Sequence, residues 1–224
     1  MSSKTRAAEA VVPGQPAGPA AGMSASWEAT VGPTRVLFGV DTIERLGELA
    51  ASLGGSKVLV VTDPGIRSAG HVARAETALG AAGCTPVVFD GVEEKPTTRH
   101  VGAGTDFARN AGVDLIVGLG GGSSMDTAKG INFLLTNGGR MEDYWGRGKA
   151  RRPMLPSIGV PTTAGTGSDA QSYALISQED THAKMACGDP KARFGGVLLD
   201  PVLSVTRPPR VTAVTALDAV GHAV

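Results

Sequence analysis

A cluster of glycines near the middle of the chain has the residue types of an anion-binding turn. The apolar run Asp114 to Val117 predicts a buried strand, and Gly120-Gly121-Gly122-Ser123 leads from it into a predicted helix. Glycine lets a backbone pass close to a phosphate, and a helix N-terminus offers free N–H groups with a favourable dipole. We therefore predict a pyrophosphate-binding turn. A plain tight turn stays open as the alternative, because the spacing is not the G-x-G-x-x-G fingerprint.

One carboxylate, Asp63, follows a second predicted strand, Val58 to Val61. Ligands of open α/β sheets bind outside the carboxyl ends of the strands. A carboxylate at that edge can accept hydrogen bonds from a ribose diol and would repel a 2′-phosphate. Asp63 is therefore a candidate ribose-binding residue, although it could equally be a helix cap before Pro64-Gly65.

A loop rich in hydroxyl groups lies between Pro156 and Ala170. It carries Thr162 and Thr163 after a predicted strand and then the run Gly165-Thr166-Gly167-Ser168. Such a loop exposes hydroxyls and backbone N–H groups together, which suits a phosphate, a ribose or a nicotinamide amide. The alternative is a Gly/Ser loop that binds nothing.

Two metal-ligand side chains lie near the end of the chain. Asp218 and His222 are spaced i, i+4 in a stretch with helical patterning, so both point from one helix face. A carboxylate and an imidazole placed in this way could hold a divalent metal. Two ligands do not complete a catalytic site, which usually has at least three from the protein.

The elements that would position these residues alternate between strand and helix. Ser26 to Thr30 and Arg35 to Phe38 predict a hairpin, and Asp41 is placed as the N-cap of the helix that follows. Strict alternation with short loops predicts βαβ units in a Rossmann-like, doubly wound parallel sheet. Beyond the two strands already named, the expected elements are a helix from about Ile66 to Ala82, a strand at Thr85 to Phe89 and a helix at Thr97 to Asn110.

The second half of the chain does not continue the strict alternation of strand and helix. Gly138 to Pro156 is expected to be an ordered excursion that forms no element, and the segment from Gln171 to Ala186 predicts a β-hairpin around Glu179-Asp180. Strands are expected at Leu155 to Val160 and Gly196 to Leu199, and a helix from Val211 onward. We predict a disordered leader over residues 1–25, an α/β domain over 26–206 and the start of a helical domain over 207–224.

Composition excludes some functions. Lys plus Arg and Asp plus Glu are 21 each, so no net field favours nucleic acid or anionic lipid. No apolar run approaches the length needed to cross a bilayer. Two cysteines far apart, Cys84 and Cys187, make no disulfide framework and favour a reducing, cytoplasmic setting.

Taken together and in this order, the motifs resemble the iron-containing, or group III, alcohol dehydrogenases. The strongest matches are GGGSSMDTAKG from Gly120, PTTAGTGSD from Pro161 and TALDAVGHAV from Thr215. The resemblance implies a dinucleotide-binding domain followed by an all-helical domain that is mostly missing here, because the chain ends in a predicted helix after two metal ligands. It also implies hydride transfer between a primary alcohol or diol (or the aldehyde) and nicotinamide in a protein that is a homodimer at full length.

The resemblance assigns roles to individual residues. Asp63 matches a residue associated with preference for NAD over NADP, and Lys184 matches a lysine near the cofactor ribose. The metal, Fe²⁺ with Zn²⁺ as the alternative, would be held by Asp218 and His222 together with two further histidines. The other implied cofactor-binding residues are Gly120, Gly121, Gly122, Ser123, Asp126, Thr162, Thr163 and Thr166.

Two departures from the family pattern bear on these assignments. Asp169 stands where many members have Glu, which is a conservative change. The remaining histidines, His71, His100 and His182, lie upstream in the wrong region to complete the metal site. Three alternatives therefore stay open: a maleylacetate reductase, an enzyme like dehydroquinate synthase or the glycerol-phosphate dehydrogenases, and a catalytically silent nucleotide-binding fragment.

Overall fold

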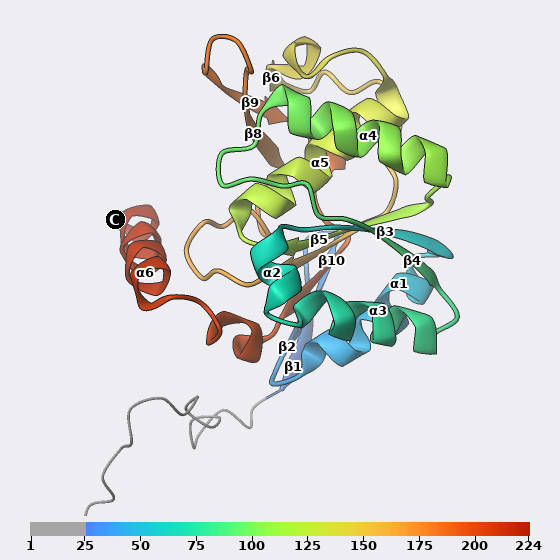
Figure 1. The fold of residues 1–224 in the computed structure, drawn as a ribbon, viewed down its shortest axis with the longest axis vertical. Coiled ribbons are helices and arrows are strands. Elements are labelled where there is room, and N and C mark those ends of the chain that lie inside the picture. The colour runs from blue at the N-terminus through green and yellow to red at the C-terminus, as the bar shows by residue number, and fades with distance from the viewer. Residues whose placement is uncertain (1–25) are drawn as a thin grey trace, which may run out of the picture.

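A seven-stranded, mostly parallel sheet forms the centre of the molecule in the computed structural model, which describes residues 26–224 (Figure 1). The predicted leader at 1–25 lies outside the described residues. The sheet order is β1-β2-β10-β7-β5-β3-β4, and β1 is antiparallel to β2 whereas the other neighbours are parallel. The strands are β1 Trp27–Val31, β2 Thr34–Phe38, β3 Lys57–Val61, β4 Thr85–Phe89, β5 Leu115–Gly120, β7 Ser157–Pro161 and β10 Gly196–Leu199.

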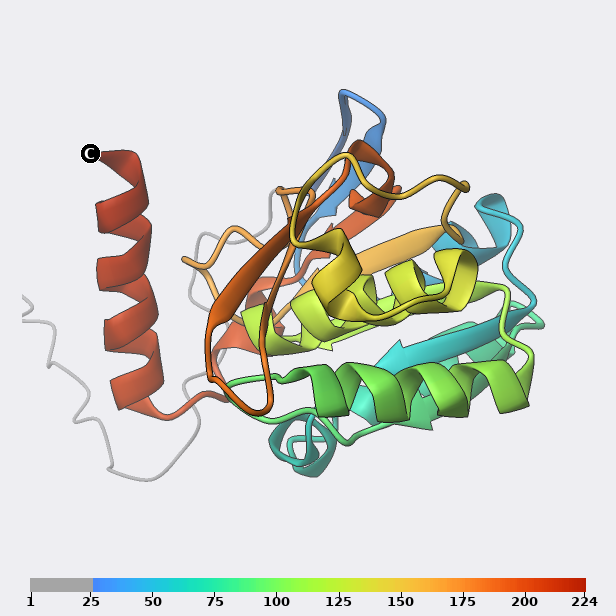
Figure 2. The same cartoon turned by 90° about the horizontal axis from the view of Figure 1, so that it is seen from above.

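Helices cover both faces of this sheet, as the predicted doubly wound α/β class requires. One face carries a short 3₁₀ turn η1 (Thr42–Arg45), α1 (Leu46–Ser52) and α3 (His71–Ala81), and the other carries α4 (Thr98–Ala111) and α5 (Gly122–Asn137) (Figures 1 and 2).

Burial of strand β5 on both faces explains why its sequence is continuously apolar. Leu115, Val117 and Leu119 belong to the core beneath α1 and α3, whereas Ile116 belongs to the core beneath α4 and α5. A strand covered on both faces has no exposed position that would take a polar residue.

The expected helix from Ile66 to Ala82 is wrong as a single element. The structure has α2 (Pro64–Ser68) and α3, with Gly70 between them at φ +83°. Glycine adopts this left-handed conformation without steric cost, so the chain turns there and a new helix begins. Asp41 occupies the N-cap position of η1, as predicted, but its backbone is left-handed and its side chain caps no N–H group; its carboxylate instead accepts a hydrogen bond of 2.7 Å from Arg74 Nη2.

A small second sheet lies beside α5, with the order β6-β9-β8. Its antiparallel strands β8 (Tyr173–Ser177) and β9 (Lys184–Gly188) confirm the predicted hairpin. The expectation that 138–156 forms no element is wrong, because it contains the 3₁₀ turn η2 (Met141–Tyr144) and strand β6 (Gly146–Arg147). Two residues of β6 pair with Cys187 and Gly188, a long-range contact with no local signature.

The last helix, α6 (Pro209–Ala223), stands beside the sheet with none of its residues buried (Figure 2). It follows the 3₁₀ turns η3 (Pro190–Ala192) and η4 (Pro201–Ser204) and begins two residues before the predicted Val211, with proline in its first turn. No helix within residues 26–224 is long and apolar enough to span a bilayer.

Candidate dinucleotide and metal site

The glycine turn, Gly120 to Ser123, lies at the carboxyl edge of the sheet and joins β5 to α5. Gly120 has φ +144°, and a Cβ atom on it would lie 2.5 Å from Ser124 Oγ, so a side chain there would be both strained and blocked. Gly121 occupies the N-cap position and has no side chain to bond the N–H groups of the first helical turn. This is the geometry in which a helix N-terminus can receive an anion.

Asp63 lies beside this turn, as its position at the end of β3 predicted. Val61 pairs with Gly118 across the sheet, and Asp63 Oδ2 would be 3.5 Å from a Cβ atom built on Gly120. Its other oxygen, Oδ1, accepts a hydrogen bond of 3.0 Å from Ile66 N and so caps α2. One carboxylate thus caps a helix and still presents an oxygen toward the glycine turn, so the two readings of Asp63 do not exclude each other.

The threonine loop, Pro161 to Asp169, closes over the glycine turn. Thr162 N donates a hydrogen bond of 2.8 Å to Gly120 O. A Cβ atom on Gly121 would lie 3.3 Å from Thr163 Cγ2, and one on Gly122 would lie 3.2 Å from Thr166 Cβ. The structure therefore brings together the glycines and threonines that the sequence singled out separately.

Several hydroxyl groups around this edge have no hydrogen-bond partner among the described residues. They are buried, and they come from three different elements: Thr62, Ser124, Thr162 and Thr163. An unpaired buried hydroxyl costs free energy, and native proteins usually satisfy it. Because these oxygens are shielded from solvent, they are unsatisfied polar groups inside the wall of this edge and not contacts already offered to a ligand.

Other predicted cofactor-binding residues lie differently. The Ser123 hydroxyl donates a hydrogen bond of 2.6 Å to Glu94 O, so its side chain is already engaged. Asp126 is only 5% exposed, and its burial raises the pKa of its carboxyl to about 6 against the opposing charge of Lys129. Lys184 is exposed at the start of β9, and its charge also acts on Asp126.

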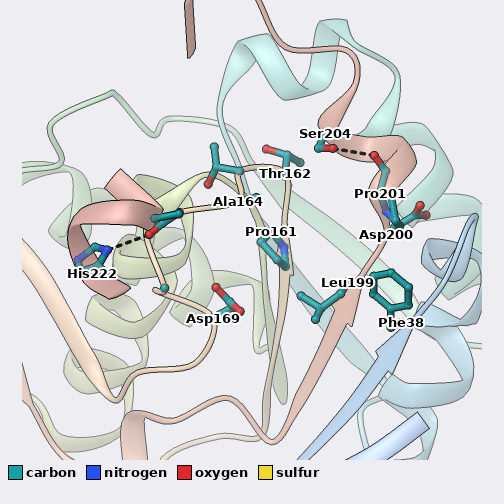
Figure 3. Close-up of a pocket in the computed structure, with 14 residues that line it drawn as sticks. Phe38, Pro161, Thr162, Ala164, Asp169, Leu199, Asp200, Pro201, Ser204 and His222 are labelled. Atoms are coloured by element: carbon teal, nitrogen blue, oxygen red, sulfur yellow. Dashed lines mark hydrogen bonds between the residues drawn. The ribbon is translucent and has the colours of Figure 1, made fainter. Parts of the chain in front are cut away.

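A cavity of about 410 Å³ continues from the threonine loop to α6 (Figure 3). Its walls come from the loop, from the end of β10 and from the last helix. Phe38, Asp169, Leu199, Asp200 and His222 line it together with Thr162 and Thr163. Its position beside the threonine loop and its mixed apolar and polar lining suit a small polar substrate.

The two predicted metal ligands share one face of α6. Asp218 Oδ1 and His222 Nδ1 are 3.9 Å apart, and both side chains are about half exposed. His222 Nδ1 also lies 3.0 Å from Gly165 O. Because a carbonyl oxygen only accepts, Nδ1 is the donor in this bond, and in the neutral imidazole the lone pair is then on Nε2. No group of three or more His, Cys, Asp or Glu side chains suited to a metal occurs within residues 26–224.

Sequence reasoning missed one residue that supports this site. Lys129 is buried in α5, and its ammonium group donates hydrogen bonds to the carbonyl of Ser168, inside the threonine loop, and to those of Gln171 and Tyr173, just after it. The signal was a lone lysine among buried residues of one helix, three positions after Asp126.

Comparison with known proteins identifies the family of this chain. Residues 33–201 match the family described as iron-containing alcohol dehydrogenase. The chain is 40% identical over 195 residues to the choline dehydrogenase of Bacillus subtilis, covering 86% of this chain and 48% of that protein. It is 37% identical over 189 residues to the 1,3-propanediol dehydrogenase of Citrobacter freundii, covering 84% of this chain and 49% of that protein.

Solved structures show the same relationship. A 1,3-propanediol oxidoreductase matches with a TM-score of 0.82 at 34% identity, covering 90% of this chain and 52% of that one. Sulfoacetaldehyde reductase from Bifidobacterium kashiwanohense, in complex with NAD⁺, matches with a TM-score of 0.75 at 26% identity, covering 83% and 49%. The chain thus spans about half the length of the curated relatives it matches. With a family match that extends over most of its length, this chain belongs to the iron-containing alcohol dehydrogenase family.

Proposed function

We propose that this chain supplies the NAD-binding part of an alcohol dehydrogenase that transfers a hydride between a primary alcohol or diol and nicotinamide. The observation that carries the proposal is the closure of the threonine loop over the glycine turn, with Asp63 beside it and the cavity leading to His222. In this arrangement the first-turn N–H groups of α5 would hold the pyrophosphate. The oxygen of Asp63 that faces the turn would hold the adenosine ribose.

The substrate would occupy the cavity between the threonine loop and α6. The relatives named above are, by their names, enzymes of choline, 1,3-propanediol and sulfoacetaldehyde, all small and polar. Asp169 and Asp200 add polar groups to a lining that Phe38 and Leu199 make partly apolar. We therefore propose a short polar alcohol or its aldehyde as the substrate class.

Asp218 and His222 would contribute two ligands to Fe²⁺, or to Zn²⁺. When bound, the metal supplies Lewis acidity toward the alcohol oxygen and lowers its pKa. His222 fits this role, because Gly165 O accepts from its Nδ1–H and the neutral ring would present the lone pair of Nε2 to the metal. Asp218 and His222 supply two donors, whereas catalytic metals usually take three or more from protein. We propose that these 224 residues alone bind nucleotide without turnover.

Two measurements on one preparation test the proposal. Calorimetry should show NAD binding to the 224-residue chain, and absorbance at the NADH band should show no reduction with short alcohols and added Fe²⁺ or Zn²⁺. A chain that is folded by circular dichroism and yet binds no NAD would contradict the nucleotide role. A longer form that binds NAD but reduces no aldehyde would contradict the dehydrogenase role and favour the other reactions of this fold.

A further inference from the structure

Lys129 is a buried cation with an unusually complete set of partners. Its side chain is 2% exposed, and Nζ donates hydrogen bonds to the carbonyl oxygens of Ser168, Gln171 and Tyr173 at 2.6, 2.7 and 3.1 Å. The ring of Phe194 lies 4.9 Å from Nζ. An ammonium group has three N–H donors, so these three carbonyls satisfy all of them.

This arrangement needs the charged form of the lysine. Burial lowers the pKa of Lys129 to about 8, and the nearby carboxyls of Asp126 and Asp169 oppose that shift. The ammonium group therefore keeps its proton at neutral pH. Burying an ammonium is unfavourable unless it is fully hydrogen-bonded, so the charge of Lys129 favours conformations in which the three carbonyls stay around Nζ.

One of these carbonyls, that of Ser168, is at the far end of the threonine loop, and the other two, those of Gln171 and Tyr173, lie between the loop and the start of β8. The near end is attached to the glycine turn through Thr162 N and Gly120 O. Between these two attachments lie Thr163 and Thr166, which are packed against Gly121 and Gly122. Lys129 is on α5, the helix that the glycine turn begins, so one rigid helix carries both the turn and the anchor of the loop.

We propose that Lys129 is a positioning residue for dinucleotide binding: it holds the end of the threonine loop so that the loop closes over the glycine turn before the ligand arrives. The proposal rests on the proposed function, because the ligand in question is NAD. If the loop is already ordered before binding, the ligand does not have to offset the entropy lost on ordering it. The affinity for the ligand is therefore higher.

The test compares Lys129→Met with a matched control in the 224-residue chain. Methionine has a similar length and is apolar, so it removes the three hydrogen bonds with little change of volume. The control is Asn132→Ala, one turn further along α5, which removes buried hydrogen bonds to the backbone of Leu155 and leaves the threonine loop untouched. Thermal unfolding compares the melting temperatures of the two variants.

The readouts are hydrogen exchange of residues 162–170 without NAD, and the Kd for NAD. We expect Lys129→Met to speed exchange in 162–170 by tenfold or more, to leave exchange in β5 unchanged and to raise the Kd by at least tenfold. Asn132→Ala should lower the melting temperature and leave the Kd within twofold. If Lys129→Met is not obtained folded, Lys129→Gln, which keeps two donors, is measured in the same way.

Three results would overturn the proposal. The first is unchanged exchange in 162–170 after Lys129→Met, and the second is faster exchange with an unchanged Kd. The third is an equal loss of NAD affinity in Asn132→Ala, which would mean that general stability is responsible. If the unmodified chain binds no NAD, the proposed function fails, and exchange in 162–170 still decides whether Lys129 holds the loop.

Discussion

The imidazole of His222 lies 3.0 Å from the carbonyl oxygen of Gly165, so the last helix touches the chain at the threonine loop. Metal-bound histidines commonly donate their second ring N–H to a carbonyl, which fixes the orientation of the ring. Gly165 lies between Thr163 and Thr166, so the proposed metal ligand contacts the same loop that closes over the proposed pyrophosphate site. A change at either site should therefore be felt at the other.

The first prediction concerns metal binding by the 224-residue chain. Two donors on an exposed helix should bind Zn²⁺ weakly, because affinity depends on ligand number and on outer-shell support. Calorimetry should show binding that is lost on dialysis and abolished by His222→Ala, whereas His182→Ala, at an exposed turn of the hairpin, should have no effect. Metal-dependent alcohol turnover that His222→Ala abolishes would contradict it, and would mean that other residues complete the site.

The second prediction concerns cofactor choice. Asp63→Gly should reduce the preference for NAD(H) over NADP(H) by ~10- to 100-fold, because a carboxylate near a 2′-phosphate costs a few kcal/mol. Asp63 also caps α2, and replacing an N-cap side chain by glycine costs roughly a few tenths of a kcal/mol of stability. Asp63→Ser separates the two effects, since serine keeps a capping oxygen without the charge. Equal Kd values for NADH and NADPH in the unmodified chain would show that Asp63 does not discriminate.

The third prediction concerns the close contact between Gly122 and the threonine loop. A methyl group on Gly122 would lie 3.2 Å from both Thr166 Cβ and Ser168 Oγ, so Gly122→Ala should push the loop away and weaken NAD binding by ~10-fold or more, at a stability cost of about 1 to 3 kcal/mol. The control is Gly102→Ala in α4, where a Cβ atom meets nothing within 4 Å. This change should leave the Kd unchanged and stabilise the helix by up to ~1 kcal/mol. An unaltered affinity for NAD in Gly122→Ala would show that the contact between Gly122 and the threonine loop is not part of the NAD site.

The fourth prediction concerns pH. Burial raises the pKa of Asp126 from an ordinary value near 4 to about 6, so the folded state holds this proton more tightly than the unfolded state does. The free energy of unfolding should therefore fall as pH rises from 4 to 7, by on the order of 2 kcal/mol relative to Asp126→Asn. Lys129 keeps its charge over this range. Urea unfolding of both proteins at pH 4 and pH 7 measures the difference, and a difference that does not change with pH would be the contrary result.

The sequence predicted those elements and motifs that depend only on neighbouring residues. The apolar run of β5, the glycines after it, the hairpin of β8 and β9 and the helix carrying Asp218 and His222 depend on side-chain period and turn chemistry within a few residues. Gly70 was the exception. One glycine in a helical pattern is usually tolerated, and only its left-handed φ shows that it divides the helix here.

Only the tertiary structure decided which of these segments meet. Strand β10 lies between β2 and β7, and this order brings Leu199 and Phe38 to the wall of the cavity. Lys129 finds its three carbonyls 39 to 44 residues further along the chain, and His222 finds Gly165 at a separation of 57 residues. Contacts of this kind are set by how strands order themselves and how helices pack. A sequence pattern reports which face of an element is apolar, but it does not report which distant backbone that face will cover.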